Sequence, residues 1–238
     1  MTRAWNALGP AALGLATLAL ALAAPAQAAL NGRLGAQYRY GFFSDHNDLR
    51  DGLVYWAARQ YHVQLEYWDF VRPGTDDQFR PEVGIHLRDR RRSSYTVQWR
   101  HERRQERLWF GTDQILSDHV VGRVEVSPII ATDTTLWVYS AGADYYWKSW
   151  NFASITVIRD PRQDGLWIVP MRLRIANEAN DWVQATFAPA SEQSVGWALD
   201  VKKRWVRLGV ERNNRYDFTN VDNTFVTVGV EFDLKPKP

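Results

Sequence analysis

The final stretch of the chain, residues 224–234, alternates strictly between two kinds of side chain. One set is apolar apart from its first member: Thr224, Val226, Val228, Val230, Phe232 and Leu234. The other set ends in two carboxylates: Phe225, Thr227, Gly229, Glu231 and Asp233. A period of two residues predicts a β-strand whose two faces meet different surroundings. Whatever fold the chain adopts must give this strand one apolar side and one polar side.

The first 28 residues have the form of a secretory signal peptide. Arg3 precedes an apolar run from Ala7 to Ala24, and Pro25-Ala26-Gln27-Ala28 forms an A-x-A cleavage site. The run is rich in alanine, is interrupted by glycine and proline, and meets no stop-transfer signal, which disfavours a transmembrane helix. We therefore expect export and cleavage after Ala28.

Composition excludes several classes of function for the exported chain. Without Arg3 it holds 28 Lys and Arg against 27 Asp and Glu, a net charge of +1. Because this balance offers no strong field to nucleic acid, we expect no nucleic-acid partner. The absence of cysteine excludes disulfides and thiolate metal sites. No later segment reaches about 20 consecutive apolar residues, so we expect no membrane-spanning helix.

The alternation of the last strand recurs along the whole exported chain. It begins at residues 34–42, where Tyr38 and Tyr40 alternate with Gln37 and Arg39. Further alternating segments lie at 83–88, 95–100, 120–127, 153–157, 167–175, 195–202 and 206–211. This pattern predicts an all-β fold with little helix.

Alternation alone fits both a soluble β-sandwich and a membrane β-barrel. The terminal strand, the tyrosines and tryptophans near predicted strand ends, and the connection lengths favour an outer-membrane barrel. Read back from the C-terminus, longer connections alternate with shorter ones, as external loops alternate with periplasmic turns. The expected external loops are 44–52, 73–80, 128–135, 159–165, 188–193 and 213–223. Both termini are then periplasmic.

The strand count depends on two ambiguous stretches. Twelve strands can be delimited, and Leu53 to Val71 is too long for one span of about 9 to 11 residues. Splitting that stretch near Gln60 gives fourteen, which satisfies the even number of single-chain barrels. Twelve would result if residues 100–110 formed one long strand. We predict an antiparallel transmembrane β-barrel of 12–14 strands, with 14 favoured, over residues 29–234 and a short tail at 235–238.

The chain resembles the small bacterial outer-membrane β-barrels, and within them it looks like the YaiO type. The resemblance covers the whole exported chain, and beside the signal peptide it rests on Tyr38-Arg39-Tyr40, residues 141–146, Arg159-Asp160-Pro161 and residues 228–234. It implies an outer-membrane location in a Gram-negative cell envelope, contact with lipid and lipopolysaccharide, and assembly by the barrel-assembly machinery. It implies no established chemistry.

One departure from that resemblance concerns the C-terminus. Such proteins commonly end on an aromatic residue, whereas this strand ends on Leu234 and four residues follow. Either assembly is less efficient or Phe232 serves in place of the terminal aromatic residue.

A barrel hydrolase acting on lipid or lipopolysaccharide would need Ser, His and an acid or amide group close together at the outer rim. Ser44-Asp45-His46-Asn47-Asp48 holds these residue types, but they are also ordinary turn formers, and sequence neighbours cannot easily form a triad. His62 and His86 fall on polar faces beside Glu66 and Arg88, as lining residues. We therefore predict no catalytic residues.

No metal or cofactor motif is present. The sequence has no His-x-x-x-His pair, no glycine-rich phosphate loop and no twelve-residue calcium loop. Asp76, Asp77, Asp217 and Asp222 could offer oxygen ligands to calcium, but acidic loops are usually only solvated. We expect no metal and no cofactor.

The polar faces are expected to line the barrel interior, which we call the lumen. The charged lining candidates are Arg39, Glu66, Arg88, Arg100, Arg123, Glu125, Asp144, Arg172, Arg174, Asp200, Lys202, Arg207, Glu211 and Glu231. Opposed charges could line a narrow channel for small polar solutes or an acidic glycan. They could equally pair across the interior and close it.

The sequence thus favours a non-enzymatic outer-membrane barrel, either a narrow channel for small polar solutes or a surface protein associated with glycan or envelope. One alternative is the barrel hydrolase of lipid or lipopolysaccharide. A second is a soluble periplasmic β-sandwich or lipocalin-like binder, which would place the Val, Ile and Leu face inside.

Overall fold

The computed structural model describes residues 32–44, 48–58, 60–71, 77–88, 92–102, 105–148, 150–161, 166–191, 195–213 and 222–234. The predicted signal peptide, 1–28, and the predicted tail, 235–238, lie outside the described residues. Within the described ranges, no helix has the length and apolar character needed to cross a membrane.

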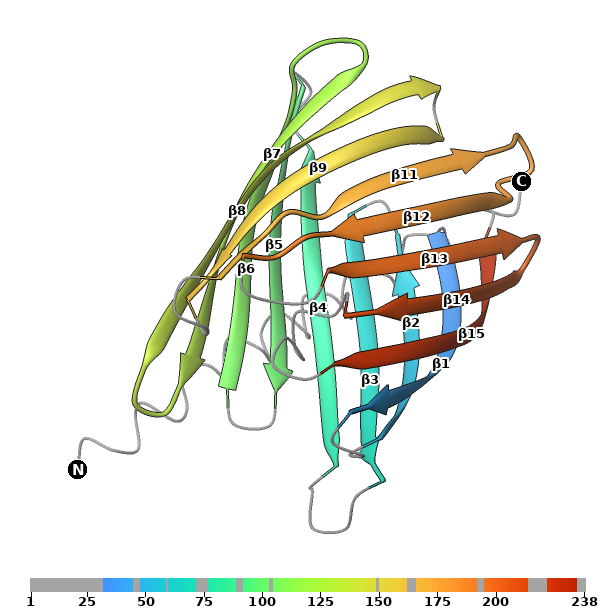
Figure 1. The fold of residues 1–238 in the computed structure, drawn as a ribbon. Coiled ribbons are helices and arrows are strands. Elements are labelled where there is room, and N and C mark those ends of the chain that lie inside the picture. The colour runs from blue at the N-terminus through green and yellow to red at the C-terminus, as the bar shows by residue number, and fades with distance from the viewer. Residues whose placement is uncertain are drawn as a thin grey trace.

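The described strands form one antiparallel sheet that closes on itself (Figure 1). Closure is complete because β1 pairs with both β2 and β15, and β8 pairs with β9. The strands are β1 (Gly32–Phe43), β2 (Leu49–Ala57), β3 (Tyr61–Phe70), β4 (Gln78–Arg88), β5 (Ser93–Glu102), β6 (Gln105–Ile115), β7 (Val120–Ala131), β8 (Thr135–Lys148), β9 (Asn151–Asp160), β10 (Leu166–Ile168), β11 (Met171–Ala176), β12 (Trp182–Ala188), β13 (Gly196–Lys203), β14 (Val206–Arg212) and β15 (Asn223–Leu234).

β10 and β11 are two parts of one interrupted strand. Both pair with β9 in a continuous register, with Ile168 opposite Ile158 and Met171 opposite Ile155. The strand is interrupted at Pro170, because proline has no N–H to donate to the hydrogen-bond ladder. The barrel therefore has fourteen strands, which confirms the favoured count and the all-β antiparallel barrel.

The ambiguous stretches resolve into hairpins. The long stretch from Leu53 to Val71 divides between β2 and β3, as expected. The single strand considered for residues 100–110 is wrong, because β5 and β6 pair as a hairpin from Ser93 opposite Gln114 to Glu102 opposite Gln105.

Several predicted loops are shorter than expected. The predicted loop 128–135 is a tight turn at residues 132–134, because β7 continues to Ala131. β2 and β4 begin inside the predicted loops 44–52 and 73–80, and β9 runs to Asp160 inside 159–165. Asp51, Arg80 and Asp160 are inward-facing polar residues near strand ends, and they resemble loop residues in the sequence. In β7 it is Pro128 that resembles the start of a loop.

The connections define two ends of the barrel. The long-loop end holds the connections 44–48, 71–77, 103–104, 132–134, 161–165, 189–195 and 213–222, whereas the short-turn end holds 58–60, 89–92, 116–119, 149–150, 177–181 and 204–205. β1 begins and β15 ends at the short-turn end. This alternation follows the expected order, although two connections of the long-loop end are short.

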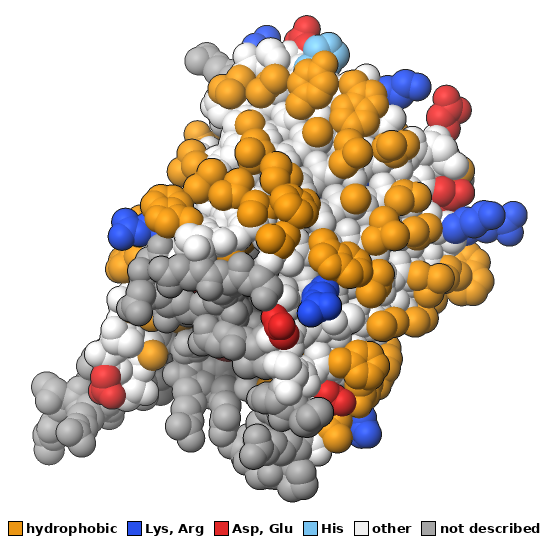
Figure 2. Space-filling model, viewed as in Figure 1, with side chains coloured by type: hydrophobic (Ala, Val, Ile, Leu, Met, Phe, Trp, Pro, Cys, Tyr) orange, Lys and Arg blue, Asp and Glu red, His pale blue; other side chains and the backbone are white. Residues whose placement is uncertain are grey.

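Apolar side chains cover the outside of the barrel. On β15, Val226 and Val228 are 44% and 52% exposed, whereas the neighbouring Phe225 and Thr227 are buried inside. Figure 2 shows hydrophobic side chains spread over the outer wall, with charged side chains sparse among them. This arrangement is the reverse of a soluble β-sandwich or lipocalin, in which the Val, Ile and Leu face would be enclosed.

Inward-facing apolar clusters occupy the long-loop end. Phe43, Leu49, Trp68 and Phe225 form one cluster, in which the rings of Phe43 and Phe225 meet edge to face at 5.5 Å. A second cluster is formed by Leu166, Ile168 and Ala188. Charged side chains lie beside the first cluster as well, because the guanidinium group of Arg80 lies 3.8 Å from the ring centre of Trp68.

Candidate functional site

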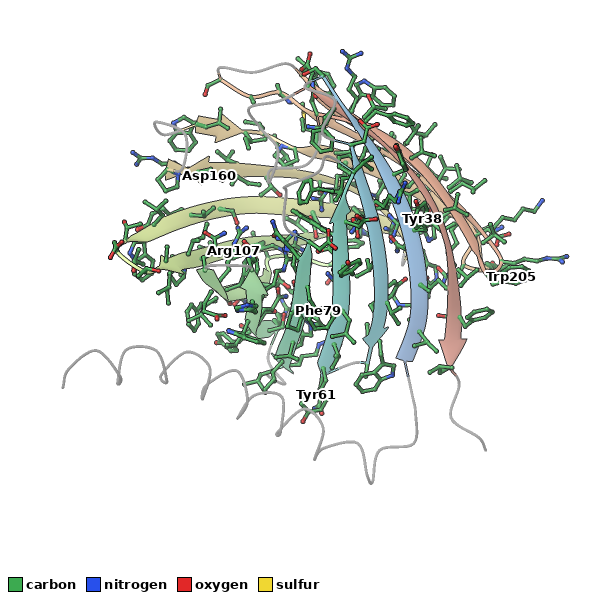
Figure 3. The ribbon with its side chains drawn as sticks, turned by 90° about the horizontal axis from the view of Figure 1, so that it is seen from below. Tyr38, Tyr61, Phe79, Arg107, Asp160 and Trp205 are labelled. Atoms are coloured by element: carbon green, nitrogen blue, oxygen red, sulfur yellow. The ribbon has the colours of Figure 1, made fainter. Side chains whose placement is uncertain are left out.

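A cavity of about 680 Å³ lies in the middle of the lumen. Its lining includes six arginines and four carboxylates: Arg39, Arg100, Arg107, Arg123, Arg172, Arg207, Glu66, Glu125, Asp160 and Glu211. Figure 3 looks along the barrel and shows Arg107 on the inner side of the wall and Trp205 on the outer side. The charges come from strands all around the ring, so only the closed barrel brings them together.

A continuous ion-pair network covers the wall formed by β1 to β5. Arg39 lies between Asp51, at 2.5 Å, and Glu66, which it also contacts directly. Glu66 in turn lies 3.4 Å from Arg80. Charge-assisted pairs of this kind satisfy carboxylates that have lost their water.

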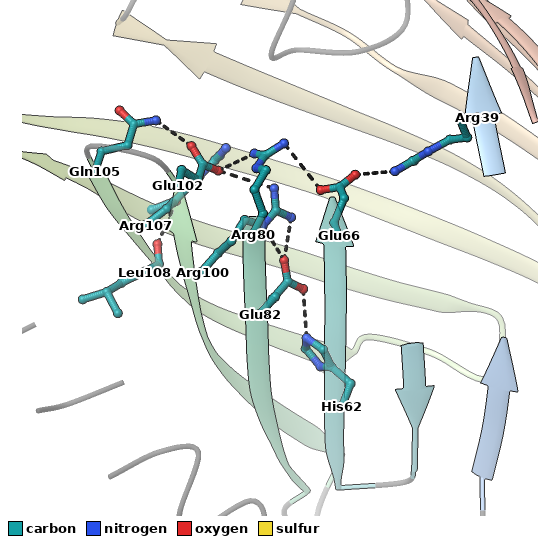
Figure 4. Close-up of polar contacts among 11 residues, drawn as sticks. Arg39, His62, Glu66, Arg80, Glu82, Arg100, Glu102, Gln105, Arg107 and Leu108 are labelled. Carbon is teal, nitrogen blue, oxygen red and sulfur yellow. Dashed lines mark hydrogen bonds and ion pairs between the residues drawn. The ribbon is translucent and has the colours of Figure 1, made fainter. Parts of the chain in front are cut away.

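The network continues along β4 and β5 (Figure 4). Arg80 contacts Glu102 at 2.7 Å, and Arg100 contacts Glu82 at 2.5 Å and Glu102 at 3.5 Å. Gln105 donates a hydrogen bond of 2.5 Å to Glu102. The charged side chains of this wall therefore pair with one another, and few of them are free to bind a solute in the lumen.

Two smaller groups of charges lie elsewhere around the ring. Arg123 contacts Asp113 and Asp144, each at 2.9 Å. On the β13–β15 side, Lys202 contacts Glu231 at 2.7 Å, and Arg207 contacts Asp200 at 2.9 Å. Tyr55 also donates a hydrogen bond of 2.5 Å to Glu231.

β11 carries two arginines whose contacts differ from those of the ion-paired arginines. Arg174 donates to the amide oxygen of Gln184 at 3.0 Å and lies 4.5 Å from the ring centre of Trp182. Arg172 is exposed in the lumen, with Ser154 and Thr186 opposite it on the neighbouring strands. Within the described part of the chain, neither arginine makes an ion pair with a carboxylate. These two cations are therefore available to an anionic solute.

Comparisons with known proteins bear on the fold. No protein-family model matches the chain, and no curated protein matches it. Among solved structures, a KdgM porin is similar with a TM-score of 0.53 and 9% identity, covering 84% of this chain and 99% of that chain. A structure described as KdgM porin in complex with disordered oligogalacturonate is similar with a TM-score of 0.52 and 9% identity, covering the same shares. The chain has a porin-like β-barrel fold. At this identity the likeness extends to the fold alone.

The candidates chosen from the sequence fall into three groups. Those that line the central cavity are Arg39, Glu66, Arg100, Arg123, Glu125, Arg172, Arg207 and Glu211. Those that contact charged or aromatic neighbours on the inner wall are Asp144, Arg174, Asp200, Lys202 and Glu231. Arg88 lies apart, in a cavity of about 290 Å³ beside His86 and Asp113 near the short-turn end.

Seven charged residues of the inner wall are absent from those candidates: Asp51, Arg80, Glu82, Glu102, Arg107, Asp113 and Asp160. Asp51 and Arg80 lie in strand ends that the sequence predicts as loops. The available signal is the alternation of Arg80, Glu82, Gly84, His86 and Arg88, which extends the β4 pattern upstream through Pro81. Proline within a strand is unusual, and it hides this extension.

The described residues contain no Ser-His-acid cluster at the long-loop end, and His46 lies outside the described residues. A hydroxyl–imidazole contact does exist between Thr96 and His86 at 3.0 Å, but it lies on the inner wall toward the short-turn end. The described ranges also contain no group of three or more His, Cys, Asp or Glu residues suited to a metal ion. Asp77 and Asp222 instead accept hydrogen bonds from Tyr67 and Asn213, and Asp76 and Asp217 lie outside the described residues.

Proposed function

We propose that this chain is an outer-membrane channel that passes small polar solutes, with a preference for anionic oligosaccharides. The observation that carries the proposal is the charged cavity of about 680 Å³ inside a closed barrel whose outer wall is apolar. An apolar exterior suits lipid, and a lumen lined by fixed charges selects solutes by charge.

The preference for anions follows from how the lumen charges are distributed. The cavity lining carries more arginines than carboxylates. Arg39, Arg80 and Arg100 are held by carboxylates. Arg172 and Arg174 on β11 have no such partner among the described residues. The KdgM structure described with oligogalacturonate, an acidic oligosaccharide, is consistent with this class of solute.

The proposal includes a location and an orientation. Lipid and lipopolysaccharide would contact the apolar outer wall, and the barrel-assembly machinery would insert it. The long-loop end would face outward, with both strand termini in the periplasm. Membership of the YaiO type is part of this proposal and rests on the sequence resemblance.

The proposal is tested by the anion preference of the reconstituted protein in a planar bilayer. Replacing Arg172 and Arg174 together by alanine should lower the ratio of chloride to potassium permeability, read from the reversal potential in a salt gradient. Arg50→Ala is the matched control, because Arg50 lies outside the lumen on β2 and is exposed. The assignment would be contradicted if the control lost its anion preference, or if the double variant kept the anion preference of the wild type.

A further inference from the structure

A chain of four hydrogen-bonded side chains crosses the inner wall toward the short-turn end. Glu82 Oε1 lies 3.0 Å from His62 Nε2, and His62 Nδ1 lies 3.0 Å from His86 Nε2. His86 Nδ1 lies 3.0 Å from the hydroxyl of Thr96. The proposed transport of solutes makes no use of this arrangement.

β4 leaves space for the imidazole ring of His62. Gly84 lies opposite His62 in the β3–β4 register, and a methyl group at position 84 would overlap the ring. Glu82 and His86 flank Gly84 on the same face of β4. The ring of His62 can therefore reach both of them, because the residue between them has no side chain.

The chemistry of the groups fixes the direction of the hydrogen bonds. Glu82 is held by Arg100 and is ionised, so it can only accept, and His62 Nε2 must carry the hydrogen. Nδ1 of neutral His62 is then an acceptor, and His86 Nε2 must donate to it. Nδ1 of neutral His86 accepts from the Thr96 hydroxyl. All three bonds run in one direction, from Thr96 to Glu82.

This series of hydrogen bonds can accept one more proton. The proton can enter at His86 Nδ1, because the Thr96 hydroxyl can rotate from donor to acceptor. A second proton would place an N–H on His62 Nδ1 against the N–H of His86, so it would break the pair. We infer that His62 and His86 form a site that binds a single proton, and that its charge increases the anion preference of the lumen as the pH falls.

Several charged and titratable groups lie around the pair: Tyr55 on β2, Glu66 on β3, Glu82 and Arg88 on β4, Arg92 just before β5, Arg100 on β5, Asp113 on β6 and Arg123 on β7. Asp113 is held by Arg123, and Glu82 by Arg100. The imidazolium would therefore add to the local positive charge at the cavity that His86 shares with Arg88. Imidazole changes charge between about pH 5 and 8, which sets the expected range.

The first test is nuclear magnetic resonance of the mature protein in detergent micelles, with ¹⁵N-labelled histidine. The chain has five histidines, so the resonances can be assigned by single replacements. We expect a scalar coupling between His62 Nδ1 and His86 Nε2 and the uptake of one proton by the pair between about pH 8 and 5. No coupling, or two independent protonations, would overturn the inference.

Glycine variants provide a matched pair for this test. Gly84→Ala should abolish the coupling, because the methyl group displaces the ring of His62. Gly52→Ala should leave it unchanged, because a methyl group there meets no atom within 4 Å. A coupling that survives Gly84→Ala would contradict the geometry.

The effect on selectivity rests on the proposed channel function and is measured separately. In a planar bilayer, the reversal potential of the wild type should shift toward that of chloride between about pH 7.5 and 5.5. The double variant His62→Gln/His86→Gln should lose this shift, because either imidazole alone could still bind the proton. His119→Gln should keep it, because His119 bonds a backbone carbonyl in an exposed turn. An equal shift in all variants would refute the link. Absence of conductance would refute the channel function, while the resonance experiment would still decide the proton site.

Discussion

At the scale of single residues, Arg80 is the centre of the interior charge network. Its side chain is 2% exposed and lies between Glu66, at 3.4 Å, and Glu102, at 2.7 Å. Its guanidinium group lies 3.8 Å from the ring centre of Trp68. Because both carboxylates are also buried, removing this cation leaves two acids with fewer partners.

Replacing Arg80 by methionine should therefore lower the free energy of unfolding by about 3–5 kcal/mol. Arg50→Met should lower it by less than about 1 kcal/mol, because its pair with Asp69 is exposed. Urea unfolding in lipid vesicles, followed by tryptophan fluorescence, measures both variants. Equal small losses would show that the Arg80 network adds little to stability.

At the scale of elements, the outward-facing positions of β14 and β15 test the assignment of faces. Leu208 and Val228 are opposite each other, and each is 52% exposed on the outer wall. Arginine at either position should lower the free energy of unfolding by about 2–4 kcal/mol near the membrane midplane. Ser140→Arg should be better tolerated, because Ser140 faces the central cavity. The same loss for all three variants in a vesicle-folding assay would contradict the faces.

Two neighbouring turns at the short-turn end are joined by Asp181. The carboxylate of Asp181 accepts the backbone N–H of Arg204 at 2.5 Å, and Arg204 has a φ of +55°, a conformation that favours glycine. This hydrogen bond and the amide of Asn177 hold the pKa of Asp181 below its ordinary value. A carboxyl group whose pKa is lower in the folded state than in the unfolded state stabilises the folded state at pH values above the unfolded-state pKa. This contribution is lost as the pH falls through the folded-state pKa.

Asp181→Asn should therefore be less stable than the wild type at neutral pH, and the difference should disappear on acidification below about pH 4. The midpoint of urea unfolding as a function of pH measures the difference. Asp133→Asn, which removes an exposed carboxylate from the turn 132–134, is the control. A difference between wild type and Asp181→Asn that stays constant down to low pH would contradict the role of the charge.

At the scale of the whole molecule, the sequence predicts the two faces better than the interior contacts. Alternation around Val228 identifies the apolar wall, and the even-number rule divides residues 53–71 correctly. The pairing of Gly32 with Leu234, which closes the ring, depends on the register of every strand between them. The contacts of Arg80 could not be predicted for the same reason, because they join three strands whose relative shifts have no sequence signal.

The sheet is closed and its outer wall is apolar, so we expect this wall to face lipid. Electrophoresis of the protein extracted from outer membranes in mild detergent, with and without boiling, tests this expectation most directly. A closed barrel that resists detergent should migrate at a different apparent mass until it is boiled. Identical migration in both lanes, with the protein found in the soluble periplasmic fraction, would contradict the account.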